Sequence, residues 1–502
     1  MNAFPTSRQR PRIASTPHAS RLTPHVRTPR KPVHSASPTN SRAFVLVGIL
    51  VLVMLVSMIA LSLLFRLKAE DTAASASTGA EQAWAAAMSG VQQAMRIATS
   101  AVPGSTDWQD LPQSCRDRFV FDDGSEQWFF TICSPPSSDS LQELRYGLTD
   151  EASKINVNYA HTANLAHLPG MTPALVDSLR DFIDPDSTPR ADGAEQEFYD
   201  ALPISRAVFN RPLDTLDQML LVRGFTPGLL YGEDANQNFR LDPNENDGDE
   251  HFPLDNNDSR LDLGLRQYLT VSSYDPNQDN DGAPRTNLND AKDPLPQIEL
   301  PPALTNFIAA LRTNKFQLTH AAELLEAKVK VPGPKGGQSE VESGIGKAEL
   351  PLALDLFTGT GEARQQDIIN INTASAPVLA SVPGIDPPLA ESICSARNGI
   401  SPERRATIAW LYQEGLVDSS LFKRVAPFLA ARSFQYSFHV VGYALPSARY
   451  RVLDVIIDVA SGKPRITYLR DLTHLGLPFK PGAERVETTV AQTRPSKEAR
   501  GG

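Results

Sequence analysis

The chain has 502 residues, too many for one compact core, so two or three domains with flanking tails are expected. Its formal net charge is -10, but residues 1–43 contain eight Lys or Arg and no Asp or Glu, which leaves 40 basic residues against 58 acidic ones elsewhere. An acidic remainder is poorly suited to bulk attraction of nucleic acid. Three cysteines with no CxxC pair exclude a disulfide-rich scaffold and a zinc pattern.

The first hundred residues predict a disordered basic leader followed by one long helix. Residues 1–43 are rich in Pro, Ser, Thr and Arg, a composition typical of disorder. Phe44 to Phe65 carries no charge and would be about 33 Å long as a helix, enough to cross a bilayer. Basic flanks stay on the cytoplasmic side, so the rest of the chain is expected across the membrane. Apolar residues at near-helical spacing continue the same helix, which is predicted over 44–100.

Two groups of predicted strands lie far apart in the chain. Residues 101–150 contain two β-rich runs around Asp122–Ser125, a hairpin signal, and residues 433–480 contain a three-stranded meander. Neither group has enough strands to stand alone, so we expect one shared antiparallel sheet. The predicted fold is therefore α+β, with a large helical region inserted into a small sheet. Cys115 and Cys133 flank the first hairpin, and a non-cytoplasmic location would permit a disulfide between them.

The inserted region contains related helical hairpins. Residues 154–183 and 367–397 share an I-N-x-N motif, a short helix, a Pro-Gly turn and a second helix, and 215–231 is a looser copy. This pattern is typical of a helix-hairpin-helix unit, whose tight turn needs the backbone freedom of Gly170, Gly224 and Gly384. Such units can grip DNA phosphates, but Thr172 and Asp386 replace the second glycine. Acidic neighbours also work against a phosphate, which favours structural or protein-binding modules over DNA clamps.

The remaining boundaries follow from composition. We predict an inserted helical domain over 151–295, helices and a Gly/Pro/Lys linker over 296–346, and a second hairpin region over 347–432. Two amphipathic helices are expected within 301–331, separated at Asn314 and Lys315. Residues 481–502 form a polar tail.

An acidic stretch after the looser hairpin has the ligand spacing of an EF-hand-type loop. The oxygen donors at positions 1, 3, 5, 7, 9 and 12 are Asp234, Asn236, Asn238, Arg240 through its carbonyl, Asp242 and Glu245. Phe239 stands where such loops carry glycine, so the turn must be strained or different. A second DxNxD-like run, which lacks the closing Glu, comprises Asp275, Asn277, Asp279 and Asp281. Both runs predict calcium, with a solvated acidic loop as the alternative.

The start of the apolar run resembles the type IV prepilin class, which includes the pseudopilins of type II secretion. A small residue, Ala43, precedes Phe44, where the resemblance implies peptidase cleavage and methylation. Most members carry Glu five residues into the mature chain, and this position is Gly48 here. Within the class, the K-type minor pseudopilin usually lacks this acid and sits at the filament tip. A buried Glu needs a partner such as a neighbour's terminal amine, which a tip subunit does not have.

The order of elements, together with several phrases, resembles the type II secretion system minor pseudopilin K family (GspK, general secretion pathway protein K). The phrases are KINVN, HLPGMTP, DGAEQEFY, PLDTLDQMLLVRGFTPGLLYG, INTAS and YLRDLTHLG. The resemblance implies calcium in the helical region, carried only to the residues from Asp234 to Glu245. It also implies a single-pass inner-membrane protein with a periplasmic head. Its implied partners are other minor pseudopilins of the tip complex, the inner-membrane assembly platform, prepilin peptidase and the lipid bilayer.

The expected function is therefore structural: a non-enzymatic subunit that initiates or caps a secretion pseudopilus. The sequence has no P-loop, HExxH or Ser/His/Asp signature, and its histidines are scattered. The alternative is a membrane-anchored helix-hairpin-helix protein of the DNA-uptake type, which rests on the hairpins. Charge discriminates between the two, because DNA binding predicts basic residues beside Gly170 and Gly384, where the sequence places acids.

Overall fold

A computed structural model describes residues 41–136, 144–248, 250–332 and 337–482. The predicted leader and the end of the polar tail lie outside these residues. The chain divides into two compact units, residues 1–73 and 74–502, and each is described by itself.

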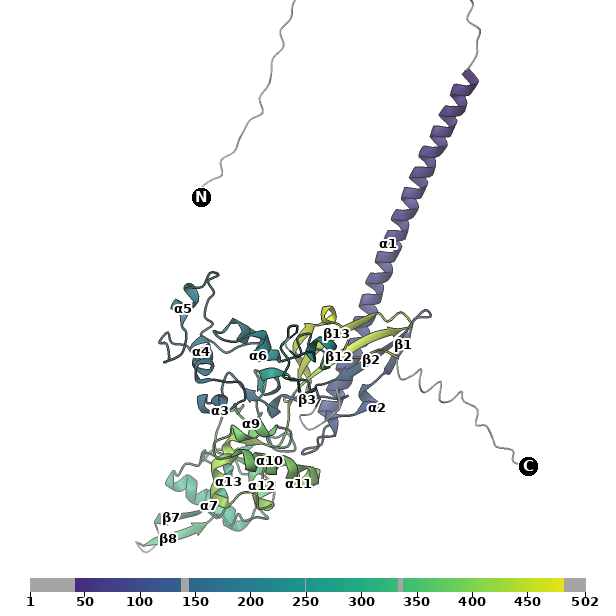
Figure 1. Ribbon diagram of the computed structural model, residues 1–502. Helices are drawn as coiled ribbons and strands as arrows, with labels where there is room; N and C mark the ends of the chain where they lie inside the picture. The colour runs from purple at the N-terminus through teal and green to yellow at the C-terminus, as the bar shows by residue number, and fades with distance from the viewer. Residues whose placement is uncertain (1–40, 137–143, 249, 333–336, 483–502) are drawn as a thin grey trace, which may run out of the picture. The chain divides into compact units, whose positions relative to one another are not determined.

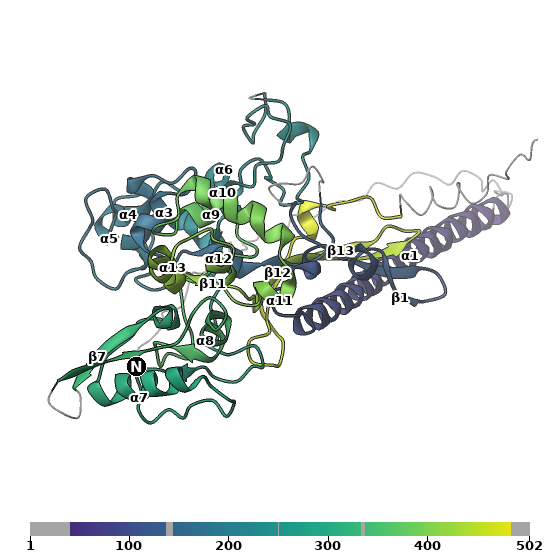
Figure 2. The same cartoon turned by 90° about the horizontal axis from the view of Figure 1, so that it is seen from below.

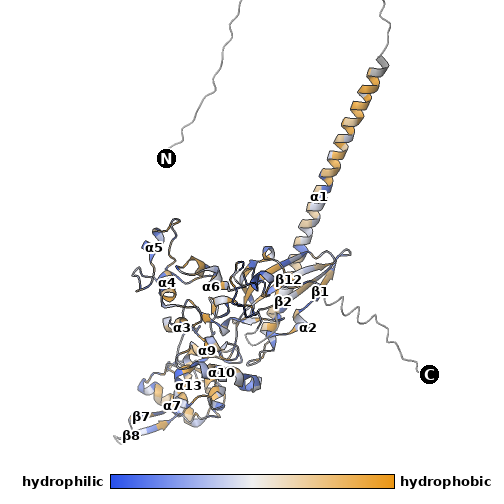
Figure 3. Cartoon of the chain, viewed as in Figure 1, coloured by the Kyte–Doolittle hydropathy of each residue, from blue (hydrophilic) through white to orange (hydrophobic). Residues whose placement is uncertain are grey.

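The first unit contains the apolar start of α1 (Ser41–Thr99), the long helix that the sequence predicts over 44–100. Among the described residues, α1 is the one helix long and apolar enough to cross a membrane. Its side chains from Phe44 to Leu64 are exposed, and Figure 3 shows this stretch as an apolar band. Exposed Leu, Val and Ile on every side of a helix are typical of a membrane span rather than of a surface helix of a soluble domain.

The second unit is built on a six-stranded sheet whose strands come from both ends of it (Figure 1). The strand order is β1 (Arg118–Asp122), β2 (Gln127–Cys133), β12 (Gln435–Leu445), β13 (Tyr450–Asp458) and β14 (Arg465–Asp471). The short β3 (Thr149–Asp150) also pairs with β12, and all pairings in this sheet are antiparallel. Early and late strands thus share one sheet, as the sequence predicts.

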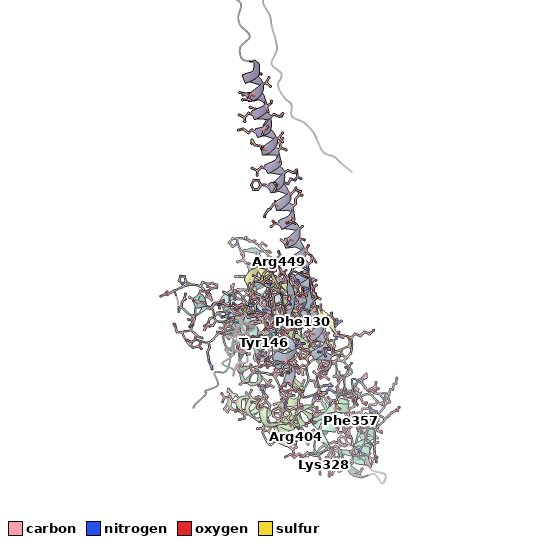
Figure 4. The ribbon with its side chains drawn as sticks, turned by 90° about the vertical axis from the view of Figure 1, so that its right-hand side faces the viewer. Phe130, Tyr146, Lys328, Phe357, Arg404 and Arg449 are labelled. Atoms are coloured by element: carbon pink, nitrogen blue, oxygen red, sulfur yellow. The ribbon has the colours of Figure 1, made fainter. Side chains whose placement is uncertain are left out.

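The second half of α1 packs on this sheet. Ala87, Val91 and Ala94 recur at helical spacing and are fully buried against strand residues that include Val440. The approach is close because β12 carries Gly442, where an added Cβ would lie 2.2 Å from the carbonyl oxygen of Ala83. Figure 4 labels two side chains at this helix, Phe130 and Arg449, and the Arg449 guanidinium donates to Ser75 Oγ at 3.0 Å.

Everything between β3 and β12 is one helical insertion with a continuous apolar core. Its α-helices are short because Pro and Gly interrupt the sequence frequently. They are α3 (Thr162–Ala166), α4 (Pro173–Ile183), α5 (Gln196–Asp200), α6 (Pro227–Tyr231), α7 (Pro302–Asn314), α8 (Leu350–Leu356), α9 (Ala376–Ala380), α10 (Pro387–Ala396), α11 (Pro402–Arg405), α12 (Trp410–Gln413) and α13 (Ser419–Val425). Outside the insertion, α2 (Pro112–Cys115) precedes the sheet.

Three repeats of an N-x-N motif organise the insertion. In each repeat the first Asn side chain accepts from the amide of the second, at 3.1 Å for Asn156–Asn158, 2.9 Å for Asn287–Asn289 and 3.0 Å for Asn370–Asn372. Each motif opens on a two-residue strand that pairs in parallel with a later one. The pairs are β4 (Ile155–Asn156) with β5 (Leu269–Thr270), β6 (Thr286–Asn287) with β9 (Phe357–Thr358), and β10 (Ile369–Asn370) with β11 (Leu429–Ala430). The insertion therefore consists of three closed units, over 155–270, 286–358 and 369–430.

These units correct part of the predicted domain division. The boundary expected between 346 and 347 falls inside the second unit, and the predicted linker over 332–346 is wrong. This segment contributes to an antiparallel hairpin of β7 (Lys328–Pro332) and β8 (Gln338–Glu342), which lies beside α7 in Figure 2. The second amphipathic helix expected before residue 331 is only a single 3-10 turn, Ala321–Leu324. Val329 and Val341 pair across the hairpin, a contact that local composition does not reveal.

Buried polar contacts fix the insertion to the sheet. The Glu151 carboxylate accepts from Ser437 Oγ of β12 at 2.6 Å, and Asp150 of β3 accepts from Asn370 Nδ2 at 3.0 Å. Tyr274 donates to Asp458 of β13 at 2.8 Å. Because the three carboxylates are buried and hydrogen-bonded, the sheet and the insertion form one packed body rather than two loosely joined domains.

Candidate calcium loop and paired helical hairpins

The predicted calcium loop follows α6 and folds back on its own first residue. Asp234 is 2% exposed and accepts from the amides of Asn238 at 2.8 Å and Phe239 at 3.2 Å. At the far end, Glu245 Oε2 accepts from the amide of Asp242 at 3.1 Å. The first and last predicted ligands are therefore both buried and held in place by backbone N–H groups.

The loop makes its sharp turn at Phe239, the position where glycine is expected. Phe239 has a φ of +62°, in the left-handed region that a bulky residue rarely adopts. Its ring is 4% exposed and stacks on His439 of β12, with the ring centroids 4.2 Å apart. The predicted strain is present, and burial of the ring offsets it.

The buried carboxylates of the loop carry negative charge that the neighbouring residues only partly balance. Burial, with a smaller contribution from Asp242, raises the pKa of Asp234 to about 6. Burial, with smaller contributions from Asp234 and Asp242, raises the pKa of Glu245 to about 7. Arg266 opposes the shift at Asp234. Glu245 Oε1 is buried and has no hydrogen-bond partner among the described residues. A buried carboxylate oxygen without a partner is costly, and a hard divalent ion bound by these oxygens would remove that cost.

The remaining predicted ligands border the same space. The side-chain amides of Asn236 and Asn238 both donate to Asp242 Oδ2 at 2.8 Å, and Asn238 Oδ1 accepts from the amide of Arg240. The loop thus brings several of the predicted ligands close together, and a calcium ion bound by them stays a prediction.

The second predicted run fits an ion less well, because arginines already use its oxygens. Asp275 lies 3.3 Å from the Arg285 guanidinium, and Arg432 donates to the carbonyl groups of Gln278 and Asp279. Asn277 bonds through both its amide nitrogen and its oxygen, and Asp279 Oδ1 accepts from the amides of Asp281 and Ala283. In this loop, positive charge comes from the side chains of Arg285 and Arg432.

The hairpin turns have the predicted backbone geometry. Gly170, Gly224 and Gly384 have φ values of +78°, +86° and +99°. The turns are also paired: a Cβ at Gly170 would lie 3.2 Å from Leu229 of α6, and one at Gly224 would lie 2.8 Å from Leu175 of α4. The first hairpin and the looser copy therefore pack reciprocally, each turn against the second helix of the other.

A fourth hairpin, which lies within the second hairpin region predicted over 347–432, pairs with the second one. It consists of α12, a turn at Gly415 with a φ of +74°, and α13. Leu421 and Val425 of α13 would each lie 3.3 Å from a Cβ at Gly384. Its signal in the sequence is the dipeptide Glu414-Gly415 followed three residues later by Asp418, which caps α13.

The residues at the second-glycine positions are helix N-caps. Thr172 and Asp386 accept from the amides of Leu175 at 3.3 Å and Leu389 at 2.9 Å. Thr226 caps α6 in the same way. An amide already bonded to its cap is not free to bind a phosphate, and the Asp386 carboxylate would repel one.

The other predicted site residues lie apart from these features. Phe44 and Gly48 are exposed on the apolar part of α1. Cys115 and Cys133 are both fully buried, and the structure describes them as free thiols. Burial raises the pKa of each to about 12. The disulfide between them stays a prediction.

Comparison with known proteins gives two family matches. Residues 148–231, which hold the first hairpin and its partner, match the family "Type II secretion system (T2SS), protein K". This part of the chain is therefore similar to type II secretion protein K. Residues 364–404 match the helix-hairpin-helix motif, which confirms the second predicted hairpin.

Outside these two matches, the similarity of the chain to known proteins is low. No curated protein matches the chain. Among solved structures, a chain in the crystal structure of the GspK-GspI-GspJ complex from the type 2 secretion system of enterotoxigenic Escherichia coli is 12% identical. The alignment covers 79% of this chain and 97% of that chain, with a TM-score of 0.36.

Proposed function

We propose that this chain is the subunit that initiates and caps a type II secretion pseudopilus. The observation that carries the proposal is the insertion of three closed units between β3 and β12 of a small pilin-like sheet. Subunits of a thin filament stack through their N-terminal helices with a short repeat. A sheet enlarged by such an insertion leaves no room for another subunit above it, so the chain belongs at an end.

The apolar part of α1 supports the same placement. Gly48 stands at the fifth residue from Phe44, and no charged side chain lies between Phe44 and Phe65. A helix without an inner carboxylate has no buried acid that requires the terminal amine of a subunit above it. The helix would sit in the inner membrane with the head in the periplasm, where other minor pseudopilins are its partners. The expected role is non-enzymatic.

The proposal is tested by finding where this subunit lies along an assembled pseudopilus. The full chain, tagged at its C-terminus, would be located by gold labelling on assembled pseudopili. We expect label at one end of each filament. Label along the filament length would contradict the proposal, as would long uniform fibres formed by the purified chain alone.

Whether residues 1–43 are a cleaved prepilin-type leader is tested separately, by mass spectrometry of the mature protein from membranes. We expect an N-terminus at Phe44, methylated, from cleavage after Ala43. An intact leader would remove the pilin-type assembly route and leave a plain membrane anchor.

We also propose that the loop from Asp234 to Glu245 binds calcium as a structural ion. A bound ion stabilises only the folded loop, so its removal lowers the free energy of unfolding by about 2.7 kcal/mol when calcium is at a hundredfold excess over its Kd. The full chain in detergent should therefore melt several degrees lower with a chelator than with calcium. The variant Glu245→Gln should melt at one temperature in both conditions. An unchanged melt of the unsubstituted chain, with no bound metal, would remove the ion.

A further inference from the structure

A cavity of about 1120 Å³ lies between the sheet and the helical insertion. The loop that follows α1 lines part of it with Thr106 and Gln109. The third unit of the insertion, over 369–430, lines it with polar or basic side chains, and none of those described is acidic. They are Asn372, Thr373, Ser375, Arg397, Asn398 and Arg405. This wall of the cavity therefore carries positive charge within a chain that is acidic overall.

The two arginines of this wall are both anchored to the segment 371–375. The Arg397 guanidinium donates through Nη1 to the carbonyl group of Ala374, at 2.6 Å. The backbone carbonyl of Arg405 accepts from Asn372 Nδ2 at 2.9 Å, and Asn372 is buried. The fold thus holds two cationic side chains beside one short segment, in the lining of one cavity.

The Arg405 side chain has no partner of its own. Its Nε is buried without a hydrogen bond, and among the described residues no hydrogen bond or ion pair involves its guanidinium. Burial, and then the charge of Arg397, lower the pKa of Arg405, while Asp107 acts in the opposite direction. A buried donor without an acceptor is unfavourable, and so is a second positive charge nearby. Both features favour the binding of a negatively charged group.

Ser375 adds an unused hydroxyl to the same lining. It occupies the N-cap position of α9, where a serine side chain ordinarily accepts from a backbone amide of the first turn. Here it makes no such bond, and its Oγ is buried without a partner among the described residues. The hydroxyl is next in the chain to Ala374, which holds Arg397, so it is available as a third donor.

We propose that Arg397, Arg405 and Ser375 form a binding site for one oxyanion, either a carboxylate group or an ion of the sulfate or phosphate type. The planar guanidinium fork matches the oxygens of such groups, and its charge strengthens the hydrogen bonds. A bound oxyanion supplies the acceptor that Arg405 Nε lacks and offsets the repulsion between the arginines. The site is at the C-terminal end of α10, where Arg397 is the C-cap, and does not involve the turn at Gly384.

The test is isothermal titration calorimetry of the full chain in detergent micelles, at constant ionic strength in a chloride buffer without other oxyanions. One probe is sodium sulfate, and the other is a peptide of six glutamates with blocked ends. We expect saturable binding of at least one probe, weakened about 10- to 100-fold by Arg405→Gln. Binding of sulfate alone identifies a free ion as the ligand, and binding of the peptide identifies an acidic protein segment.

Arg404→Gln is the matched control. Arg404, labelled in Figure 4, is the neighbouring residue of α11, but it pairs with Glu414 and does not line the cavity. Its substitution should leave the affinity for either probe unchanged. No saturable binding of either probe, or equal affinities for Arg405→Gln and the unsubstituted chain, would overturn the site.

Thermal melts separate binding from a merely structural role. In chloride alone, Arg405→Gln should melt at the same temperature as the unsubstituted chain or higher, because its guanidinium has no bond to lose and one repulsion disappears. Sulfate or the peptide should then raise the midpoint of the unsubstituted chain more than that of the variant. If Arg405→Gln does not fold, Ser375→Ala decides the matter. Its loss of one unbonded hydroxyl should weaken binding several-fold, and undiminished affinity would overturn the site.

Discussion

Phe239 combines two opposing effects at a single residue. Its left-handed φ of +62° costs about 1–2 kcal/mol for a residue with a Cβ. Its ring fills a buried position against His439, which for a phenylalanine is worth about 3–5 kcal/mol relative to alanine. The stabilisation from burying the ring is larger than the cost of the left-handed backbone, so the loop keeps its turn without glycine.

We predict that Phe239→Ala and Phe239→Gly both destabilise the protein, but by different amounts. Both variants lose the ring, whereas only the glycine variant also relieves the backbone strain. The glycine variant should therefore be more stable than the alanine variant by about 1 kcal/mol, and less stable than the unsubstituted chain by about 2–3 kcal/mol. Denaturant unfolding at a fixed calcium concentration measures the free energy of unfolding of both variants. Equal stability of the two variants would show that the turn stores no strain.

His320 gives stability a dependence on pH. Its Nδ1 accepts from the amide of Ala322 at 3.1 Å, which requires the neutral ring at that nitrogen. Burial and then Arg285 lower the pKa of His320 to about 4, while Glu323 and Asp275 oppose them. Since the folded pKa lies below the ordinary 6.5, the contribution to stability is complete above pH 6.5 and is lost as the pH falls towards 4.

We predict that His320→Asn removes this loss, because asparagine can accept from the same amide and does not titrate. Between pH 6.5 and pH 4 the unsubstituted chain should lose up to about 3 kcal/mol more than the variant, at about 1.4 kcal/mol per pKa unit. Free energies of unfolding measured at several pH values in this range would show the difference. Parallel curves for the two proteins would mean that His320 does not titrate as described.

At the scale of elements, the contact between α1 and β12 depends on glycine. At Gly442 an added Cβ would meet the backbone of α1, 2.2 Å from Ala83 O and 2.5 Å from Ala87 N. Backbone atoms of a packed helix cannot move aside as a side chain can, so the helix itself would have to shift.

We predict that Gly442→Ala lowers the free energy of unfolding by about 1–3 kcal/mol, the range of overpacking in a core. Gly399→Ala is the matched control, since no atom lies within 4 Å of a Cβ there. Thermal or denaturant unfolding of both variants gives the comparison. If the two variants were equally stable, the helix would not be held against the sheet by this contact.

The elements that the sequence predicts well are those with a local signal. The apolar run of α1, the Pro-Gly turns and the β-branched strands each carry their own periodicity, and all are present as predicted. The N-x-N motif at Asn287 was missed because α7 follows it at a distance and without a Pro-Gly turn. The hairpin of β7 and β8 was mistaken for a linker, because its stability comes from cross-strand pairs such as Lys328 with Glu342, at 2.6 Å.

The candidate site residues also differ in whether a local sequence pattern predicts them. The loop from Asp234 to Glu245 could be predicted because all its ligands lie within one short spacing pattern. By contrast, the Arg432 side chain that bonds to the Gln278 carbonyl could not be foreseen, because it comes from a distant unit.

At the scale of the whole molecule, the helical hairpins raise the possibility that the chain binds DNA. A basic side chain does approach the second turn, since Arg424 Nε would lie 3.6 Å from a Cβ at Gly384. Against it stand the capping Asp386 and the excess of acidic residues in the chain. Binding to DNA depends chiefly on neutralised phosphates, which this balance does not favour.

We predict no retention of duplex DNA by the full chain in a gel shift at moderate salt. Weak retention at low salt should disappear as salt is raised and should be reduced by Arg424→Ala. Tight retention that survives moderate salt would favour the DNA-uptake alternative over a secretion role.

The position of the insertion between β3 and β12 also governs when the protein can fold. Strand β2 ends at Cys133 and its partner β12 begins at Gln435, so the hydrogen bonds that join them cannot form until almost the whole polypeptide has been synthesised. Until then β1 and β2 have an open edge, which is the kind of surface that chaperones cover. Completion of the last strands would thus set the earliest moment at which the sheet could close and the second half of α1 could pack on it.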